Sequence, residues 1–139
     1  MNRTSLLAIF FLALPLSSCS DFKEGKSLAD SALHEFHEKF NTQNFDYLYE
    51  NAHQDFKSVT SQEEFLQLME AIHRKLGPVT DTVNSGWNVN SYNLTTYVSL
   101  TQDTAFESGK GTESFVYQIE DKQALLLKYN INSNDLIMK

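Results

Sequence analysis

The chain has 139 residues, and its 18 aspartate and glutamate residues outnumber its 11 lysine and arginine residues, which gives a formal net charge of −7. An acidic chain is a poor match for nucleic acid, and we expect no nucleic-acid partner. The same charge disfavours direct attraction to anionic lipid headgroups. The length suits one domain, and the single cysteine excludes an internal disulfide, so the core alone must hold this domain together.

The N-terminal residues have the layout of a secretory signal. Arg3 is the one charged side chain ahead of an uninterrupted apolar run, residues 6–16, and two small residues, Ser17 and Ser18, then suit a processing site. The apolar run is about half as long as the ~20 residues that a membrane-spanning helix needs. We therefore predict a signal peptide over residues 1–18 in preference to a transmembrane anchor.

Cys19 is the only cysteine and follows this run directly. The segment Leu16-Ser17-Ser18-Cys19 resembles a bacterial lipobox, the sequence at which the cysteine thiol receives a diacylglycerol, the signal is cut before the cysteine, and the new amine is acylated with a fatty acid such as palmitate. Multiple acyl chains hold a protein to a membrane where one chain would not. The resemblance therefore implies a lipoprotein anchored at Cys19. The alternative is an ordinary cleaved signal with an incidental cysteine.

The lipobox resemblance also implies a location. A lipoprotein of this kind belongs to the cell envelope, with its acyl chains as the membrane contact. In a Gram-negative host the absence of aspartate directly after Cys19 is similar to the class sorted to the outer membrane, facing the periplasm. Residues 19–26 are then a short polar, lipidated tether, and residues 27–139 form a single domain.

Helical patterns dominate the first half of this domain. The first helix is predicted to start near Ser27, since apolar residues then recur at helical spacing as far as Phe40. Residues 41–44 interrupt the pattern, a shorter helix covers residues 45–52, and an irregular connection covers residues 53–60.

The third predicted helix has the clearest boundaries. Ser61 and Glu64 form a capping box at its start. An apolar stripe from Phe65 onward gives it one buried face. Gly77 and Pro78 end it, because glycine adopts the left-handed conformation that follows many helices.

Everything after Pro78 has strand character. The expected strands cover residues 79–89 (with an interruption near Ser85-Gly86), 94–106, 112–119 and 124–131, and the expected turns are residues 108–111 and Asp121-Lys122. In the last strand, residues 125–127 are three leucines, apolar on both faces, which predicts a central strand covered on both sides.

The predicted fold is α+β, with three N-terminal helices packed on a curved antiparallel sheet of about four strands, cone-like in shape. At this point the chain resembles the ketosteroid-isomerase-like superfamily, which includes the nuclear transport factors. The similarity rests on element order and on Phe45–Ala52, Ser61–Phe65 and Lys75–Val79. Uncharacterised bacterial lipoproteins with that fold are similar in Gly111–Phe115 and Lys128–Ser133.

The resemblance implies a pocket between sheet and helices, in which enzymes of the superfamily use carboxylate, tyrosine or histidine side chains to move protons. The candidate lining residues are Tyr49, His53, Trp87, Tyr97, Glu113, Tyr117 and Tyr129. None lies in a recognisable enzyme motif, and the structural alternative is that the aromatic residues fill the core. Glu113 shares a predicted strand face with Phe115 and Tyr117, and an edge salt bridge is the structural interpretation of it.

Two histidines of the first predicted helix are candidate metal ligands. His34 and His37 are three residues apart, a spacing that can hold a metal ion. Because Phe36 and Phe40 define the buried face, the histidines are expected on a solvated flank. We expect no metal site and no cofactor.

The sequence thus predicts a lipid-anchored cell-envelope protein with a non-enzymatic domain that binds a ligand or a protein partner. One alternative is an envelope enzyme of isomerase or hydrolase type that uses Glu113 or His53 as a base. Another is a structural homodimer formed through the open face of the sheet. The fold alone does not decide among them.

Overall fold

The computed structural model describes residues 18–138, so the predicted signal peptide, except for its last residue, and the side chain of Cys19 lie outside the described part. Five helices and four strands follow one another as α1 (Ser18–Asn41), α2 (Phe45–Glu50), α3 (Gln54–Val59), α4 (Gln62–Leu76), β1 (Val79–Tyr92), β2 (Thr95–Phe106), β3 (Gly109–Glu120), β4 (Gln123–Asn132) and α5 (Asn134–Met138). Within this range, no helix is both long enough and apolar enough to cross a bilayer.

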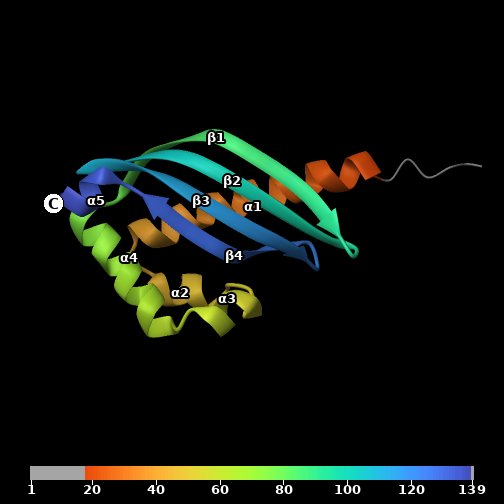
Figure 1. The fold of residues 1–139 in the computed structure, drawn as a ribbon, viewed down its shortest axis with the longest axis horizontal. Helices are drawn as coiled ribbons and strands as arrows, with labels where there is room; N and C mark the ends of the chain where they lie inside the picture. Colours follow the sequence, from red (N-terminus) through yellow and green to blue (C-terminus); the bar gives the residue numbers. More distant parts are fainter. Residues whose placement is uncertain (1–17, 139) are drawn as a thin grey trace, which may run out of the picture.

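The four strands form one antiparallel sheet in the order β1-β2-β3-β4, so each strand pairs with its neighbour in sequence. The sheet is open and not strongly curled. The helices α1 to α4 gather on one side of it (Figure 1). We call the helix-covered side the inner face; it carries Val98, Leu100, Glu113, Phe115 and Tyr117, all of them buried. The predicted α+β class is confirmed.

The core lies between this inner face and the helices, and α1 and α4 contribute the two longest buried stripes. α1 contributes a buried stripe at helical spacing, Ala29, Leu33, Phe36 and Phe40. α4 contributes a second stripe, Phe65, Met69, Ile72 and Leu76. Together these stripes remove a large apolar area from water, at about 25 cal/mol per Å² of stabilisation.

The ends of α4 are as predicted. The Oγ of Ser61 accepts a hydrogen bond from the backbone N–H of Glu64, and the Glu64 carboxylate accepts one from the backbone N–H of Ser61. The hydrogen bond from the Ser61 N–H to the carboxylate lowers the pKa of Glu64 most, and a second one to the carboxylate, from the Ser61 hydroxyl, lowers it further. Gly77 ends the helix with a φ of 78°, a conformation that glycine adopts without steric cost.

Two helix predictions were wrong in extent. α1 begins at Ser18 and not near Ser27, so residues expected to form a tether are helical. Gly25 lets this early part approach the sheet, since a Cβ there would lie 3.3 Å from Cγ2 of Thr96. The connection expected over residues 53–60 contains α3, whose N-cap is His53: its Nδ1 accepts a hydrogen bond from the N–H of Asp55.

One predicted turn is displaced. The β2–β3 turn consists of Glu107 and Ser108, because Phe106 pairs with Gly109, and the glycines of residues 108–111 lie inside β3. Gly109 is needed for close packing, since a Cβ there would lie 2.9 Å from both Asp135 and Leu76. The C-terminal helix α5, which carries Asp135, was not predicted.

β4 is an edge strand, which corrects the prediction of a central one. It pairs with β3 alone. Its three leucines are explained by what covers them: Leu126 is buried on the inner face, and its carbonyl accepts a hydrogen bond from the N–H of His53 at 2.9 Å, so the α2–α3 segment shields this edge. The Asp121-Lys122 turn and the irregularity in β1, between Asn84 and Gly86, are confirmed.

Candidate functional site

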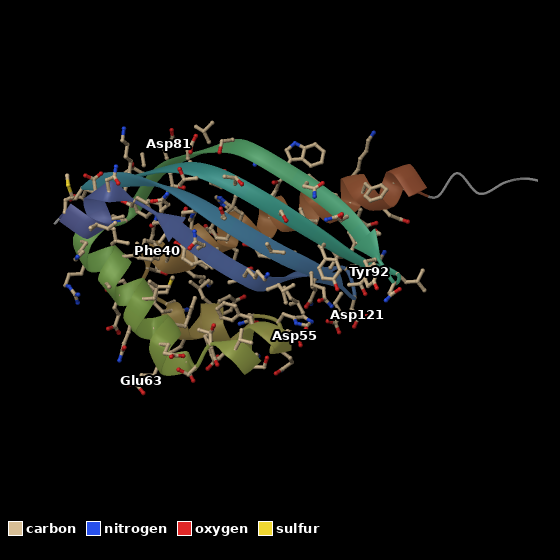
Figure 2. The ribbon with its side chains drawn as sticks, in the orientation of Figure 1. Phe40, Asp55, Glu63, Asp81, Tyr92 and Asp121 are labelled. Carbon is tan, nitrogen blue, oxygen red and sulfur yellow. The ribbon has the colours of Figure 1, made fainter. Side chains whose placement is uncertain are left out.

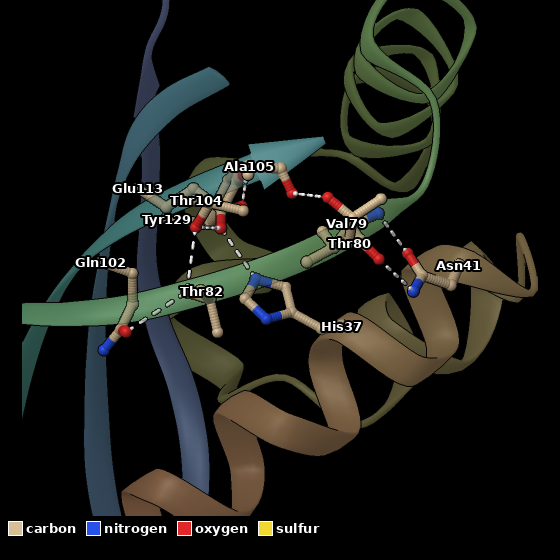
Figure 3. A network of polar contacts seen from close by, with 10 residues as sticks. All are labelled: His37, Asn41, Val79, Thr80, Thr82, Gln102, Thr104, Ala105, Glu113 and Tyr129. Atoms are coloured by element: carbon tan, nitrogen blue, oxygen red, sulfur yellow. Dashed lines mark hydrogen bonds and ion pairs between the residues drawn. The ribbon is translucent and has the colours of Figure 1, made fainter. Parts of the chain in front are cut away.

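A polar cluster is buried under the inner face, with the carboxylate of Glu113 at its centre (Figure 3). Its Oε2 lies 2.7 Å from Nε2 of His37 on α1 and accepts a hydrogen bond of 2.7 Å from the hydroxyl of Thr104 on β2. Its Oε1 accepts one of 2.8 Å from the hydroxyl of Tyr129 on β4. Three elements thus donate to one side chain of a fourth, β3. We call these four residues the Glu113 cluster.

The cluster continues toward β1 through hydroxyl groups. The Oγ1 atoms of Thr82 and Thr104 are 3.1 Å apart, and Thr82 also donates to the side-chain carbonyl of Gln102 at 3.3 Å. Gln102, Thr104 and Glu113 are each only about 2% exposed. A buried carboxylate is costly unless hydrogen-bonded, and here both of its oxygens have donors.

The cluster overturns two predictions. Glu113 makes no edge salt bridge; it is buried because position 113 alternates in phase with Phe115 and Tyr117 on the inner face. His37 does not lie on a solvated flank. It follows Leu33 by four residues and precedes Phe40 by three, so it belongs to the buried stripe of α1, whereas His34 is largely exposed.

The electrostatics of the cluster favour a neutral tyrosine. Burial, then the charge of Glu113, then the hydrogen bond to Glu113, raise the pKa of Tyr129 well above its ordinary value. Tyr129 therefore stays protonated and keeps donating to the carboxylate. The arrangement ties α1 to three strands.

A pocket of about 340 Å³ lies beside the cluster, between α1, α2, β3 and β4. This volume is within the range of small-molecule sites. Its apolar lining consists of Leu28, Ala32, Phe36, Leu48, Ala124, Leu125 and Leu126. Exposed polar residues at its rim, Ser31, Glu35, Asn51 and Gln123, leave it open to solvent on one side.

Tyr117 gives the pocket a polar group without a partner. Its side chain lines the pocket and is about 2% exposed, yet its hydroxyl makes no hydrogen bond to the described residues. Burial, followed by the charges of Glu113 and Glu35, raises the pKa of Tyr117 far above its ordinary value. The hydroxyl is therefore neutral and can donate or accept one hydrogen bond.

The rim carries a polar pair. The hydroxyl of Tyr47 on α2 donates to Oε1 of Glu35 on α1 at 2.7 Å. This hydrogen bond is the main reason why the pKa of Tyr47 is raised. The carboxylate of Glu35 places a negative charge at the mouth of the pocket, where the other polar residues of the rim are uncharged.

An aromatic wall separates the pocket from the Glu113 cluster. Phe36 lines the pocket and stacks on Tyr129 with ring centroids 5.2 Å apart, while Phe115 lies edge-on to Phe36 at 5.1 Å. Glu113 does not line the pocket. The carboxylate and the hydroxyl of Tyr117 therefore belong to two different environments on one strand face.

The seven candidate residues are distributed as follows. Glu113 and Tyr129 meet in the cluster, and Tyr117 lines the pocket next to it. Tyr49 is placed elsewhere: its hydroxyl donates to the carbonyl of Thr60 at 2.9 Å, which ties α2 to the end of α3.

The other three candidates lie away from both features. His53 caps α3, and its Nε2 is 3.4 Å from the carboxylate of Glu120. Trp87 is opposite Leu100 in the register of β1 and β2 but is 61% exposed, with Nζ of Lys26 5.6 Å from its ring. Tyr97 is on the outer face of β2, where it pairs with Gln118.

Sequence reasoning missed Thr104 and His37 of the Glu113 cluster and the rim pair of Glu35 and Tyr47. His37 could have been placed by extending the stripe of α1 one position. Glu35 and Tyr47 could not, because their contact depends on how α2 turns back along α1 after residues 42–44, and no local pattern encodes that angle.

A second buried polar atom in the described part of the chain, Nε2 of His73, also has no partner. The His73 ring packs against Phe40 and Phe45, with its centroid 5.2 and 6.2 Å from theirs, and it does not line the pocket. Over residues 18–138, no three histidine, cysteine or carboxylate side chains gather closely enough to hold a metal ion.

Comparison with protein families finds no family model that matches the chain, and comparison with curated proteins finds no relative. The pocket and the cluster must therefore be interpreted from their own chemistry.

Proposed function

We propose that this is a lipid-anchored cell-envelope protein whose domain binds a small, largely apolar ligand in the pocket between α1, α2, β3 and β4. One observation carries the proposal: Tyr117 lines a pocket of about 340 Å³, and its buried hydroxyl has no hydrogen-bond partner among the described residues. Buried polar groups nearly always have partners, because an unmade hydrogen bond costs about 1–3 kcal/mol. A ligand that reaches the hydroxyl would remove that cost.

The pocket limits the chemistry of the ligand. Its walls favour an aliphatic or aromatic body, and Tyr117 favours a single hydroxyl, carbonyl or amine on that body. The carboxylate of Glu35 at the rim repels an anion entering from solvent. The ligand is therefore neutral or cationic.

Binding is favoured over catalysis by the placement of the acidic groups. Both oxygens of Glu113 are occupied by donors, and the aromatic wall separates it from the pocket. His53 is engaged as a helix cap at some remove from the pocket lining. An enzyme that uses either residue as a base stays a prediction from the sequence, as does a homodimer through the outer face of the sheet.

The relationship to ketosteroid-isomerase-like domains is also a proposal. Its support is the element order, helices followed by a four-stranded antiparallel meander, and a pocket between the two layers. The open sheet departs from a closed cone, and the pocket is correspondingly open at its rim.

The ligand site is tested with a neutral fluorescent probe, N-phenyl-1-naphthylamine, titrated into the full chain. Ala32→Leu should weaken probe binding at least tenfold, because the larger side chain on α1 fills the pocket. Ala71→Leu is the matched control, since Ala71 is a partly buried alanine on α4 outside the pocket lining. The anionic analogue with a sulfonate group should bind more weakly than the neutral probe.

Equal affinity of the probe for the wild type and for Ala32→Leu would place the probe elsewhere and remove the support for this site. Tighter binding of the anionic analogue would contradict the role given to Glu35.

The location has its own test. Replacement Cys19→Ser removes the thiol that a lipoprotein diacylglycerol would occupy, so the protein should leave the membrane fraction or keep its signal peptide. Membrane-bound Cys19→Ser protein with its signal normally removed would show that lipidation of Cys19 is not the anchor.

A further inference from the structure

One of the three hairpin turns exposes a leucine. The β1–β2 turn consists of Asn93 and Leu94, and the side chain of Leu94 is fully exposed. Next to the turn, Tyr92 is 71% exposed. We call Tyr92, Asn93 and Leu94 the β1–β2 tip.

Leucine is a poor choice for this turn on local grounds. Asn93 and Leu94 have φ values of 48° and 64°, the left-handed region in which glycine and asparagine are favoured and larger side chains are strained. The Leu94 side chain is fully exposed and so gains nothing from the core. It therefore helps neither the turn nor the packing of the domain.

The other two turns differ. Glu107-Ser108 and Asp121-Lys122 join their strands with polar residues only, as a solvated turn should. Lys122 has the same left-handed conformation as Leu94, with a φ of 59°. An exposed apolar side chain in a turn is therefore particular to the β1–β2 tip.

The tip lies at the end of the molecule where α1 begins. Gly25 of α1 packs against Thr96, two residues beyond the tip, and Lys26 lies over Trp87 of the same hairpin. Figure 1 shows the β1–β2 turn and the start of α1 at the same end, and Figure 2 labels Tyr92 there. Phe22, in this first part of α1, is also exposed.

In sequence, α1 begins after the apolar run 6–16 with one residue between them, and Cys19 is its second residue. A bilayer that held the N-terminus by acyl chains on Cys19 would therefore lie close to the tip. The net charge of −7 gives the domain no electrostatic attraction to anionic lipid, so any further contact must be apolar.

We propose that the β1–β2 tip inserts its leucine and tyrosine into the interfacial layer of the bilayer to which the N-terminus is attached. The proposal rests on the lipidation of Cys19 proposed above. Tyrosine favours the interface, where its ring is apolar and its hydroxyl is hydrated, and leucine reaches the acyl region. Weak insertion suffices, because the anchor already holds the tip at high effective concentration. The charged side chain of Asp121, at the neighbouring β3–β4 turn, disfavours the acyl region and so limits how deeply this end of the domain can enter the bilayer.

The test uses the full lipidated protein in phosphatidylcholine vesicles with or without brominated acyl chains, which quench nearby tryptophan. Trp87 is the only tryptophan, so Trp87→Phe gives a silent background into which Leu94→Trp places a probe at the tip. The matched control is Ile137→Trp, an exposed apolar position on α5 at the opposite end of the molecule (Figure 1).

Bromination should lower the emission of the tip probe about twofold, since insertion of ~5–10 Å reaches the acyl boundary, and should leave the control probe unchanged. Equal emission at both positions in vesicle-bound protein would overturn the insertion of the tip and leave the anchor in place. Protein that does not float with the vesicles would overturn both. A tip probe that is shielded at high protein concentration but not quenched by bromine would show that a second copy covers the tip instead.

A second variant distinguishes a role of Leu94 in membrane contact from a role in the stability of the domain. Leu94→Gly should melt at or above the temperature of the wild type, because glycine relieves the left-handed position. It should also transfer faster between vesicles. A melting temperature well below that of the wild type would show that Leu94 serves the fold and would remove the reason for proposing insertion.

Discussion

Glu113 and Tyr117 are four residues apart on the same face of β3, and each is about 2% exposed, yet their polar atoms are treated in opposite ways. The carboxylate of Glu113 has three donors from three elements. The hydroxyl of Tyr117 has no partner among the described residues. The first group is part of what holds the domain together. The second contributes nothing to the fold through its hydroxyl, which is why we assign it to a ligand.

The largest expected effect is the loss of the carboxylate. Glu113→Ala leaves His37, Thr104 and Tyr129 buried without their acceptor, and removing one partner of a buried charged network costs about 3–5 kcal/mol. Urea unfolding at neutral pH measures this loss in the free energy of unfolding. Glu120→Ala, at an exposed glutamate of the same strand, is the control and should change the free energy of unfolding by less than about 0.5 kcal/mol. Equal losses in the two variants would show that the cluster does not stabilise the domain.

The next effect is the loss of one donor. Thr104→Val keeps the shape of the side chain but removes the hydroxyl that donates to Glu113, and a hydrogen bond to a charged group contributes about 1.5–3 kcal/mol. Thr104→Ser should restore most of this loss, because it returns the hydroxyl. If the serine variant were no more stable than the valine variant, packing and not the hydrogen bond would explain the effect.

Alkaline pH should destabilise the domain through Tyr117 and Tyr129. Their pKa values are raised in the folded state, so the unfolded chain loses these protons first, near pH 10. Stability is therefore intact below about pH 10 and falls above it, by about 1.4 kcal/mol per pH unit for each tyrosine. Unfolding curves between neutral pH and pH 11 measure the slope, which Tyr117→Phe should reduce. An unchanged slope in that variant would contradict the burial of its hydroxyl.

The smallest effect is at the rim of the pocket. Glu35→Gln keeps an acceptor for Tyr47 but removes the charge, so the pKa of Tyr47 should fall toward its ordinary value while stability stays within about 0.5 kcal/mol of the wild type. Ultraviolet titration of the tyrosines follows the pKa. The variant should also bind the anionic naphthylamine analogue more tightly than the wild type does. An unchanged ratio of affinities for the neutral and the anionic probe would show that Glu35 does not repel anionic ligands.

Much of the scaffold could be predicted because its signals are local. The capping box of Ser61 and Glu64, the stop at Gly77 and the alternation that put Glu113 with Phe115 and Tyr117 all depend on neighbours in sequence. The role of Glu113 could not be predicted, because its donors come from three other elements. The edge position of β4 was missed for a similar reason: its leucines are covered by helices far away in the chain, not by a second sheet neighbour.

The hydroxyl of Tyr129 stabilises the fold, whereas we propose that the hydroxyl of Tyr117 binds a ligand. The direct test is the free energy of unfolding of Tyr117→Phe beside that of Tyr129→Phe, without ligand and at neutral pH. Tyr129→Phe should lose about 1.5–3 kcal/mol, since its hydroxyl donates to a carboxylate, and Tyr117→Phe should lose nothing or become slightly more stable. If Tyr117→Phe lowered the free energy of unfolding as much as Tyr129→Phe does, the Tyr117 hydroxyl would already have a partner within the protein. The reason for proposing a ligand in the pocket would then be gone.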